Sequence, residues 1–158
     1  MDFYPFETPL GYMALGAEEG SITRLYLPNS PVPRLMPHAT PLLEEGEKQL
    51  LEYLSGLRRE FDLPLKPQGT PFQHKVWAAL QEIPYGQVRS YRDIALAVDC
   101  PKGFRAVGMA NNRNPIPILI PCHRVIGANG SLVGYAGGLE LKQALLSLEN
   151  PSFFPAKA

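Results

Sequence analysis

The sequence has no long apolar run and no excess of either charge. No stretch approaches the roughly 20 apolar residues that a membrane helix needs, and residues 1–20 carry acids where a secretory signal would be basic and then apolar. We therefore expect an intracellular, cytoplasmic protein with no membrane partner. With 45% hydrophobic residues among 158, the chain can bury a core as one domain or as two small, tightly associated ones.

Cysteine is scarce as well. The two cysteines, Cys100 and Cys122, are too few for a secreted disulfide scaffold, and neither has the neighbours of a structural zinc site. Both thiols are expected to be free in a reducing compartment.

A net charge of zero at first argues against a nucleic-acid partner, because phosphate binding needs surplus Lys and Arg. The charges are nevertheless unevenly distributed along the chain. Residues 1–70 carry six Lys/Arg and ten Asp/Glu, whereas residues 71–158 carry nine and five. Any contact with a nucleic acid is therefore expected in the second part, with moderate and salt-sensitive affinity.

The first part of the chain has the pattern of a small mixed α/β domain, residues 1–66. Extended segments are expected at 3–6, 11–15 and 22–27, the last two forming a hairpin around a glycine-containing turn. After a proline-rich link, residues 42–57 have the spacing of an amphipathic helix. The apolar face of that helix is predicted to consist of Leu43, Leu50, Leu51 and Leu54.

A second, α-rich domain is expected at residues 70–150, followed by a tail at 151–158, which makes the fold class α/β (α+β). Thr70 and Gln73 form a capping box for a helix over 72–83 that buries Trp77. Ser90 begins another helix, and Pro101 is predicted to open a third that runs to about residue 112.

The last two helices suggest a helix-turn-helix, a weak signal by itself because many α-helical cores contain such pairs. The second helix strengthens it. Ala106 and Gly108 would let its backbone approach a groove closely while Arg105 extends outward. A packed helix with an ordinary surface arginine is the alternative.

Residues 114–121, NPIPILIP, cannot form a helix and would make a poor central strand, because proline removes backbone donors. We expect a rigid, buried, extended segment that delivers Cys122, His123 and Arg124. A reactive cysteine needs a partner that lowers its pKa and keeps some thiolate at neutral pH. The neighbouring His and Arg favour this interpretation over a buried, inert thiol. Because adjacent residues point in different directions, a water is expected to bridge Cys122 and His123.

Asn129 and Gly130 indicate a turn, and residues 134–138, GYAGG, a loop of small residues that can close over a flat ligand. A final helix is expected at 139–148, with Leu141, Leu145 and Leu148 facing inward. Glu149 at its end either orients a histidine or is an ordinary surface acid.

Taken together, these motifs resemble the O6-alkylguanine-DNA alkyltransferases. The resemblance rests on NPIPILIPCHRVIG at 114–127, followed by GYAGG and the leucine-rich helix, and extends to PYGQVRSYRDIA at 84–95 and RAVG at 105–108. It covers residues 70–150 as the active-site domain, and TPLGYMAL more weakly links the first part to the amino-terminal domain of the family. The family implies irreversible transfer of an alkyl group from O6-alkylguanine in DNA to a cysteine of the protein, with O4-alkylthymine left open as a second substrate.

The resemblance also assigns residue roles. It implies minor-groove binding of double-stranded DNA by the helix-turn-helix, nucleotide flipping, and repair by a monomer without metal or cofactor. The implied catalytic group is Cys122 as nucleophile and alkyl acceptor, with His123, Glu149, Asn114 and Tyr91. The implied residues for DNA binding and flipping are Arg105, Ala106, Gly108 and Tyr91, and the base pocket is implied to consist of Val125, Tyr135, Ala136, Gly137 and Lys142.

Two alternatives remain open from the sequence. One is a protein with the same fold that binds alkylated guanine without transfer, which Cys122, His123 and Glu149 argue against. The other is an unrelated cysteine hydrolase that uses Cys122 and His123. It would need an oxyanion hole that the sequence does not reveal, and it leaves Arg105 and Tyr91 unexplained.

Overall fold

The computed structural model describes residues 1–153 and 155, so the predicted tail lies partly outside the described residues. The chain divides into two compact units. The first comprises Met1–Gln68 and Pro115–Pro117, and the second comprises Gly69–Asn114 and the chain from Ile118 onward. The sequence did not predict that a short segment ahead of Cys122 would belong to the first unit.

The first unit contains an antiparallel three-stranded sheet in the order β1 (Asp2–Thr8), β2 (Gly11–Glu18) and β3 (Ser21–Tyr26). The predicted hairpin is β2 and β3. Its turn is made by Glu19 and Gly20, whose φ angles of 49° and 79° fit the type I′ geometry that matches strand twist. The hairpin turn therefore has the glycine that its left-handed backbone favours.

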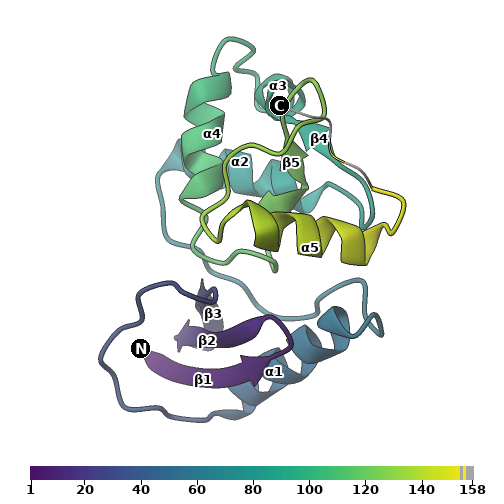
Figure 1. The fold of residues 1–158 in the computed structure, drawn as a ribbon. Coiled ribbons are helices and arrows are strands. Elements are labelled where there is room, and N and C mark those ends of the chain that lie inside the picture. The colour runs from purple at the N-terminus through teal and green to yellow at the C-terminus, as the bar shows by residue number, and fades with distance from the viewer. Residues whose placement is uncertain (154, 156–158) are drawn as a thin grey trace. The chain divides into compact units, whose positions relative to one another are not determined.

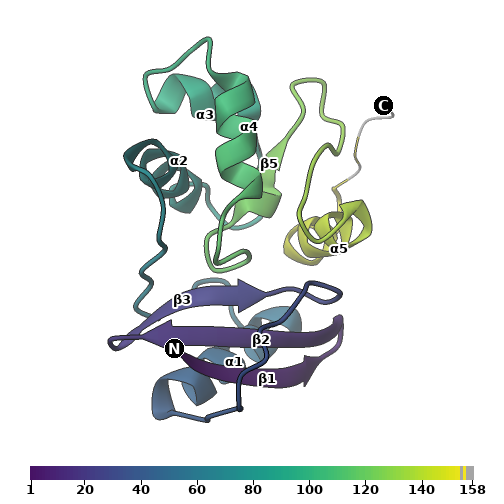
Figure 2. The same cartoon turned by 90° about the vertical axis from the view of Figure 1, so that its left-hand side faces the viewer.

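Helix α1 (Pro41–Leu54) packs along one face of this sheet, as Figures 1 and 2 show. The Thr40 side chain caps it by accepting from Leu43 N at 3.2 Å. The backbone of Gly46 lies so close to β2 that a Cβ there would stand 2.6 Å from Leu15 Cδ1. The helix ends before its predicted limit, and Leu57 is exposed. Its buried face includes Leu43, Leu50 and Tyr53, while Leu51 and Leu54 are only half-buried.

The second unit begins with α2 (Pro71–Gln81), α3 (Tyr91–Ala97) and α4 (Phe104–Asn112), which pack against one another. The capping boxes predicted from Thr70 and Ser90 are both present and fix the starts of α2 and α3. The predicted burial of Trp77 is confirmed, and its Nε1 donates to Ala110 O at 2.9 Å. This bond ties α2 to the last turn of α4.

The predicted start of the third helix at Pro101 is wrong. A turn closed by a bond of 2.8 Å from Gly103 N to Cys100 O occupies that position, and the helix begins at Phe104. The Cys100 sulfur lies so close to Gly103 that it leaves no room for a Cβ at that position. The chain therefore uses Pro101 in a turn rather than in a first helical turn.

The segment before Cys122 is buried as predicted but is not fully extended. Ile118 and Leu119 form a turn, and the φ of Ile118 is 73°, a left-handed conformation that is rare for a β-branched residue. Leu25 N in the first unit donates to Pro115 O at 2.9 Å. The segment is therefore held at one end by β3 and bends sharply before Cys122.

A 3-10 turn (Cys122–Arg124) leads directly into β5 (Val125–Ile126), which pairs in parallel with β4 (Arg89–Ser90). This pairing was not predicted, because two-residue strands leave no periodic signal. It places the chain just after Cys122 beside the start of α3.

Helix α5 (Leu139–Glu149) has the predicted extent but a different inner face. Leu145 is buried as expected, whereas Leu141 and Leu148 are only half-buried. The buried face instead consists of Lys142, Leu145, Leu146 and Glu149, at the i, i+3, i+4 and i+7 positions of a helix. Two charged residues, Lys142 and Glu149, therefore point into the core, and the spacing of the leucines alone could not predict this.

Candidate active site

Cys122 is held by a dense set of bonds to its backbone and side chain. It is only 4% exposed, and its backbone N donates to Ile120 O at 2.8 Å. Asn111 Nδ2, from the last turn of α4, donates to Cys122 O at 3.3 Å. Asn114 Nδ2 donates to Ile120 O at 2.7 Å, and the Asn114 side chain also hydrogen-bonds the thiol. The sulfur therefore has a fixed position.

His123, Arg124 and Glu149 form a buried ionic cluster. The Glu149 side chain is 1% exposed and accepts two bonds from Arg124, from Nε at 2.8 Å and from Nη2 at 2.9 Å. Its Oε2 lies 2.8 Å from His123 Nε2. Arg124 Nη1 also donates to Ile83 O at 2.7 Å. Glu149 is therefore no surface acid. It is the anchor of the residues that follow Cys122.

This cluster fixes the tautomer of His123. A carboxylate that already accepts two guanidinium bonds is ionised and can only accept, so His123 Nε2 must carry the proton it shares with Glu149. Burial lowers the pKa of His123, with Glu149 opposing the shift, so the ring is neutral at pH 7. Its other nitrogen, Nδ1, then presents a lone pair, which is the arrangement of a general base.

The thiol itself is not activated as the sequence suggested. Burial raises the pKa of Cys122 to about 11, although the Asn114 bond and the Lys142 charge favour the thiolate. The expectation that a neighbour would keep thiolate present at neutral pH is therefore wrong for the free protein. A nucleophilic Cys122 would have to lose its proton first, and the neutral imidazole of His123 is a group that could receive it.

Lys142 ties the walls of the candidate base pocket together. Its Nζ donates to Val125 O in β5, to Val133 O at 2.9 Å and to Gly134 O at 3.2 Å. Burial lowers the pKa of Lys142 to about 8, and Cys122 opposes this shift. Because all three donors meet backbone carbonyls, Lys142 holds the loop in place rather than pointing at a ligand.

Tyr91 lies at the same loop. Its hydroxyl donates to Val133 O at 2.9 Å, and its ring lies 6.0 Å from Lys142 Nζ. Burial raises the pKa of Tyr91, and the Cys122 charge adds to the shift, so it is a neutral donor near the sulfur. A Cβ at Gly108 would lie 3.8 Å from the Tyr91 ring, so α4 packs closely against this tyrosine.

The remaining pocket residues lie in the loop before α5. Tyr135 O accepts from Gly138 N at 3.0 Å, which closes a turn around Ala136 and Gly137. The Tyr135 ring is half-buried, and its hydroxyl oxygen is fully buried.

The predicted DNA-contacting residues lie on α4. Val107, Ala110 and Asn111 form its buried face, whereas Arg105 and Ala106 are exposed. The exposed face, with Arg105 and Ala106, is open to a ligand. Among the interactions that the structure describes, Arg105 makes no contact with Cys122 or His123. The predicted catalytic residues therefore come together without Arg105, the residue predicted to act in nucleotide flipping.

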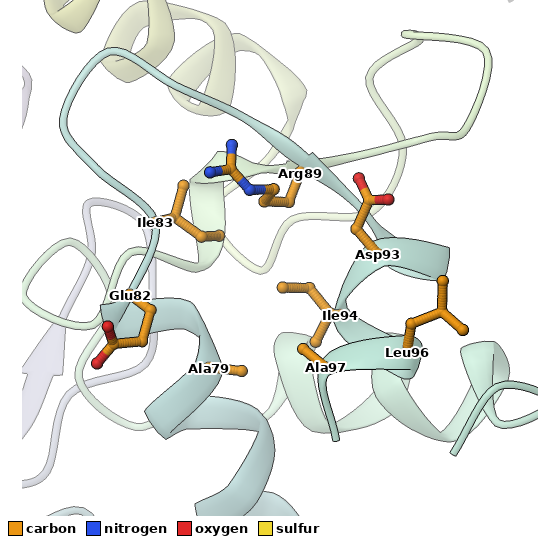
Figure 3. Close-up of a pocket in the computed structure, with 8 residues that line it drawn as sticks. All are labelled: Ala79, Glu82, Ile83, Arg89, Asp93, Ile94, Leu96 and Ala97. Atoms are coloured by element: carbon orange, nitrogen blue, oxygen red, sulfur yellow. The ribbon is translucent and has the colours of Figure 1, made fainter. Parts of the chain in front are cut away.

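A hollow of about 520 Å³ opens elsewhere on the second unit (Figure 3). Glu82 at the end of α2 and Asp93 on α3 lie on its two sides, and Arg89 projects above it. It contains none of the predicted catalytic residues.

No helix of the described chain is long and apolar enough to cross a membrane. The described residues hold no cluster of three metal-binding side chains.

Comparison with known proteins identifies the chain's family. Residues 71–151 match the DNA binding domain of 6-O-methylguanine DNA methyltransferase, and residues 3–67 match the ribonuclease-like domain of the same family. The chain belongs to the 6-O-methylguanine DNA methyltransferase family. This confirms the family and the mixed α/β fold that the sequence indicated.

Several relatives are similar over nearly their whole length. The constitutive methylated-DNA–protein-cysteine methyltransferase of Bacillus subtilis is 51% identical, over 97% of this chain and 98% of its own. The enzyme of the same name from Methanosarcina acetivorans is 47% identical over 91% and 95%. The solved structure of Mycobacterium tuberculosis OGT in complex with DNA has a TM-score of 0.89 and 41% identity, and the match covers 99% of this chain and 96% of that one.

The sequence singled out Arg124 as a neighbour of Cys122 but did not pair it with Glu149, although a buried Glu149 needs a cationic partner. It missed Asn111 altogether. Asn111 carries no such signal, since its contact with Cys122 O depends on how α4 packs.

Proposed function

We propose that this protein repairs alkylated DNA by moving the alkyl group from O6 of guanine onto Cys122 Sγ, irreversibly and once per molecule. The observation that carries the proposal is the neutral His123, held by Glu149 through Nε2 with Nδ1 left as a base, directly after a fixed and protonated Cys122. The family supplies the substrate, because its curated members act on methylated DNA.

Binding uses the exposed face of α4 in the minor groove of double-stranded DNA. Ala106 and Gly108 allow the helix backbone to approach closely, and Arg105 fills the gap that the flipped nucleotide leaves in the stack. Tyr91 crowds the phosphate that rotates. Flipping costs a few kcal/mol, and less where the lesion weakens pairing, which favours damaged bases.

The chemical step is a displacement at the alkyl carbon. The Cys122 proton passes through a water to His123 Nδ1, and Glu149 stabilises the resulting imidazolium. The sulfur forms a bond to the carbon while the carbon–O6 bond breaks, and its electron pair stays on the guanine. Tyr91, whose hydroxyl donates to Val133 O in the free protein, exchanges that bond for one to the base as this charge develops, and the base takes up a proton.

The product explains the single turnover. A thioether is a poor leaving group, and no other described cysteine lies in the site to reverse the reaction, since Cys100 belongs to the turn before α4. We further propose that the protein acts as a cytoplasmic monomer on DNA.

Intact mass spectrometry tests the proposal. The protein is mixed with an oligonucleotide duplex that contains one O6-methylguanine, and peptide mapping locates any added methyl group. We expect one methyl per molecule on Cys122, no addition in Cys122→Ser, and full addition in the matched Cys100→Ser variant. Tight binding without mass gain would indicate a lesion-binding protein instead, and turnover of a small thioester or peptide would revive the hydrolase.

A further inference from the structure

Three buried polar atoms have no hydrogen-bond partner among the described residues: His123 Nδ1, Tyr135 Oη and Asn111 Oδ1. Burying a polar atom without a partner costs the full desolvation of that atom, so such atoms are rare and call for an explanation. The mechanism above uses only one of them.

All three belong to the surroundings of Cys122. Asn111 touches the Cys122 carbonyl through Nδ2, so its Oδ1 lies on the same amide beside that residue. His123 is the next residue in the chain. Tyr135 directly follows Gly134, whose carbonyl accepts from the same Lys142 Nζ that donates to Val125 O, three residues after Cys122. Burial, with the charges of Cys122 and Glu149, raises the pKa of Tyr135 well above the usual value. The Tyr135 hydroxyl is therefore a buried, protonated donor.

The donors and acceptors match one water molecule. His123 Nδ1 and Asn111 Oδ1 can only accept, while the Tyr135 hydroxyl and the Cys122 thiol can donate. A water has two hydrogens to give and two lone pairs to fill, and buried waters typically make about three such bonds.

Resting on the proposed function, we propose that Tyr135 and Asn111 are positioning residues that hold the water through which Cys122 passes its proton to His123. Before transfer, the water accepts from the thiol and from Tyr135 and donates to His123 Nδ1 and to Asn111 Oδ1. After transfer, it accepts from the imidazolium N–H and from Tyr135 and donates to the thiolate and to Asn111. The water keeps four bonds in both states, so the proton moves without reorganisation of its cage.

The Tyr135→Phe variant tests this role, with Tyr12→Phe as control because Tyr12 is exposed in the first unit. Single-turnover methyl transfer at saturating duplex is measured from pH 6 to pH 10, together with DNA affinity and melting temperature. Losing a hydrogen bond on a developing charge should slow transfer about 10- to 100-fold at pH 7.5. The loss should shrink towards pH 10, because thiolate formed directly from Cys122 then bypasses the relay. DNA affinity should stay within about twofold.

An unchanged rate, or an equal loss at every pH, would overturn the proposal, since a merely structural defect has no reason to follow Cys122 ionisation. The wild-type rate measured alongside tests the proposed function separately. A high-resolution crystal structure gives a second test that needs no variant. It should show an ordered water within hydrogen-bond distance of His123 Nδ1, Tyr135 Oη and Asn111 Oδ1, and its absence would overturn the assignment.

Discussion

Replacing Glu149 with Gln perturbs the cluster behind Cys122 while preserving side-chain size. Glu149 accepts three bonds of 2.8 to 2.9 Å from Arg124 and His123. An amide offers one oxygen and one NH2, so at least one N–H of the cluster would face another N–H. The Arg124 charge would lose its counter-ion in a site where both side chains are at most 10% exposed.

Removing one partner of a buried ion pair costs about 3–5 kcal/mol, because the other charge stays desolvated. For a protein of this size, each kcal/mol lowers the melting temperature by about 2–4 °C. We therefore expect Glu149→Gln to melt about 6–20 °C below wild type. Transfer should also slow by about 10²- to 10⁴-fold, because the His123 imidazolium loses its stabilising charge.

Differential scanning calorimetry and single-turnover transfer measure the two effects. The matched control is Glu140→Gln, an exposed acid at the start of the same helix, which should change stability by less than about 0.5 kcal/mol. In a double-mutant cycle, adding Arg124→Met to Glu149→Gln should recover part of the lost stability. A Glu149→Gln protein that melts within about 2 °C of wild type would refute the charge argument.

Four further outcomes follow from the structure. Trp77→Phe leaves the Ala110 carbonyl without its indole donor and should lower the free energy of unfolding by about 1–3 kcal/mol, measured from the denaturant midpoint. Arg105→Ala should impair repair of duplex lesions more than transfer from a free-base analogue, and equal losses would count against the finger role. Because burial lowers the pKa of His123, transfer should hold down to about pH 6.5 and fall only in more acid solution. Iodoacetamide labelling of Cys122 in free protein should instead rise with pH up to about 11, and a plateau near pH 8 would contradict its raised pKa.

The sequence predicted helix starts correctly where they depend on residues close together in the chain. The capping boxes at Thr70 and Ser90 place two helix starts correctly, because capping depends on residues three apart. The start at Pro101 failed because a proline suits a turn as well as a first helical turn. The β4–β5 pair and the left-handed Ile118 were missed, since both depend on packing between segments distant in sequence.

The candidate site likewise combines features that nearby residues determine with features that depend on packing between distant segments. The Cys122–His123 dipeptide and its family motif were visible in the sequence, but the environment that sets their protonation was not. Burial decides whether Cys122 is a thiol or a thiolate, and the sequence alone suggested the wrong answer. The inward orientation of the Lys142 and Glu149 side chains was likewise not predicted, because the leucine spacing of α5 indicated a different buried face.

The raised pKa of Cys122 suits a protein that can react only once. At pH 7 a thiol with a pKa of about 11 is ionised in about one molecule in 10⁴, so oxidants and stray electrophiles find little thiolate to attack. In the proposed mechanism the base is His123, which Glu149 holds in place, so the proton leaves Cys122 only as the alkyl carbon approaches the sulfur. On this proposal, burial protects the single reactive thiol, and the neutral imidazole of His123 makes it reactive once the substrate is bound.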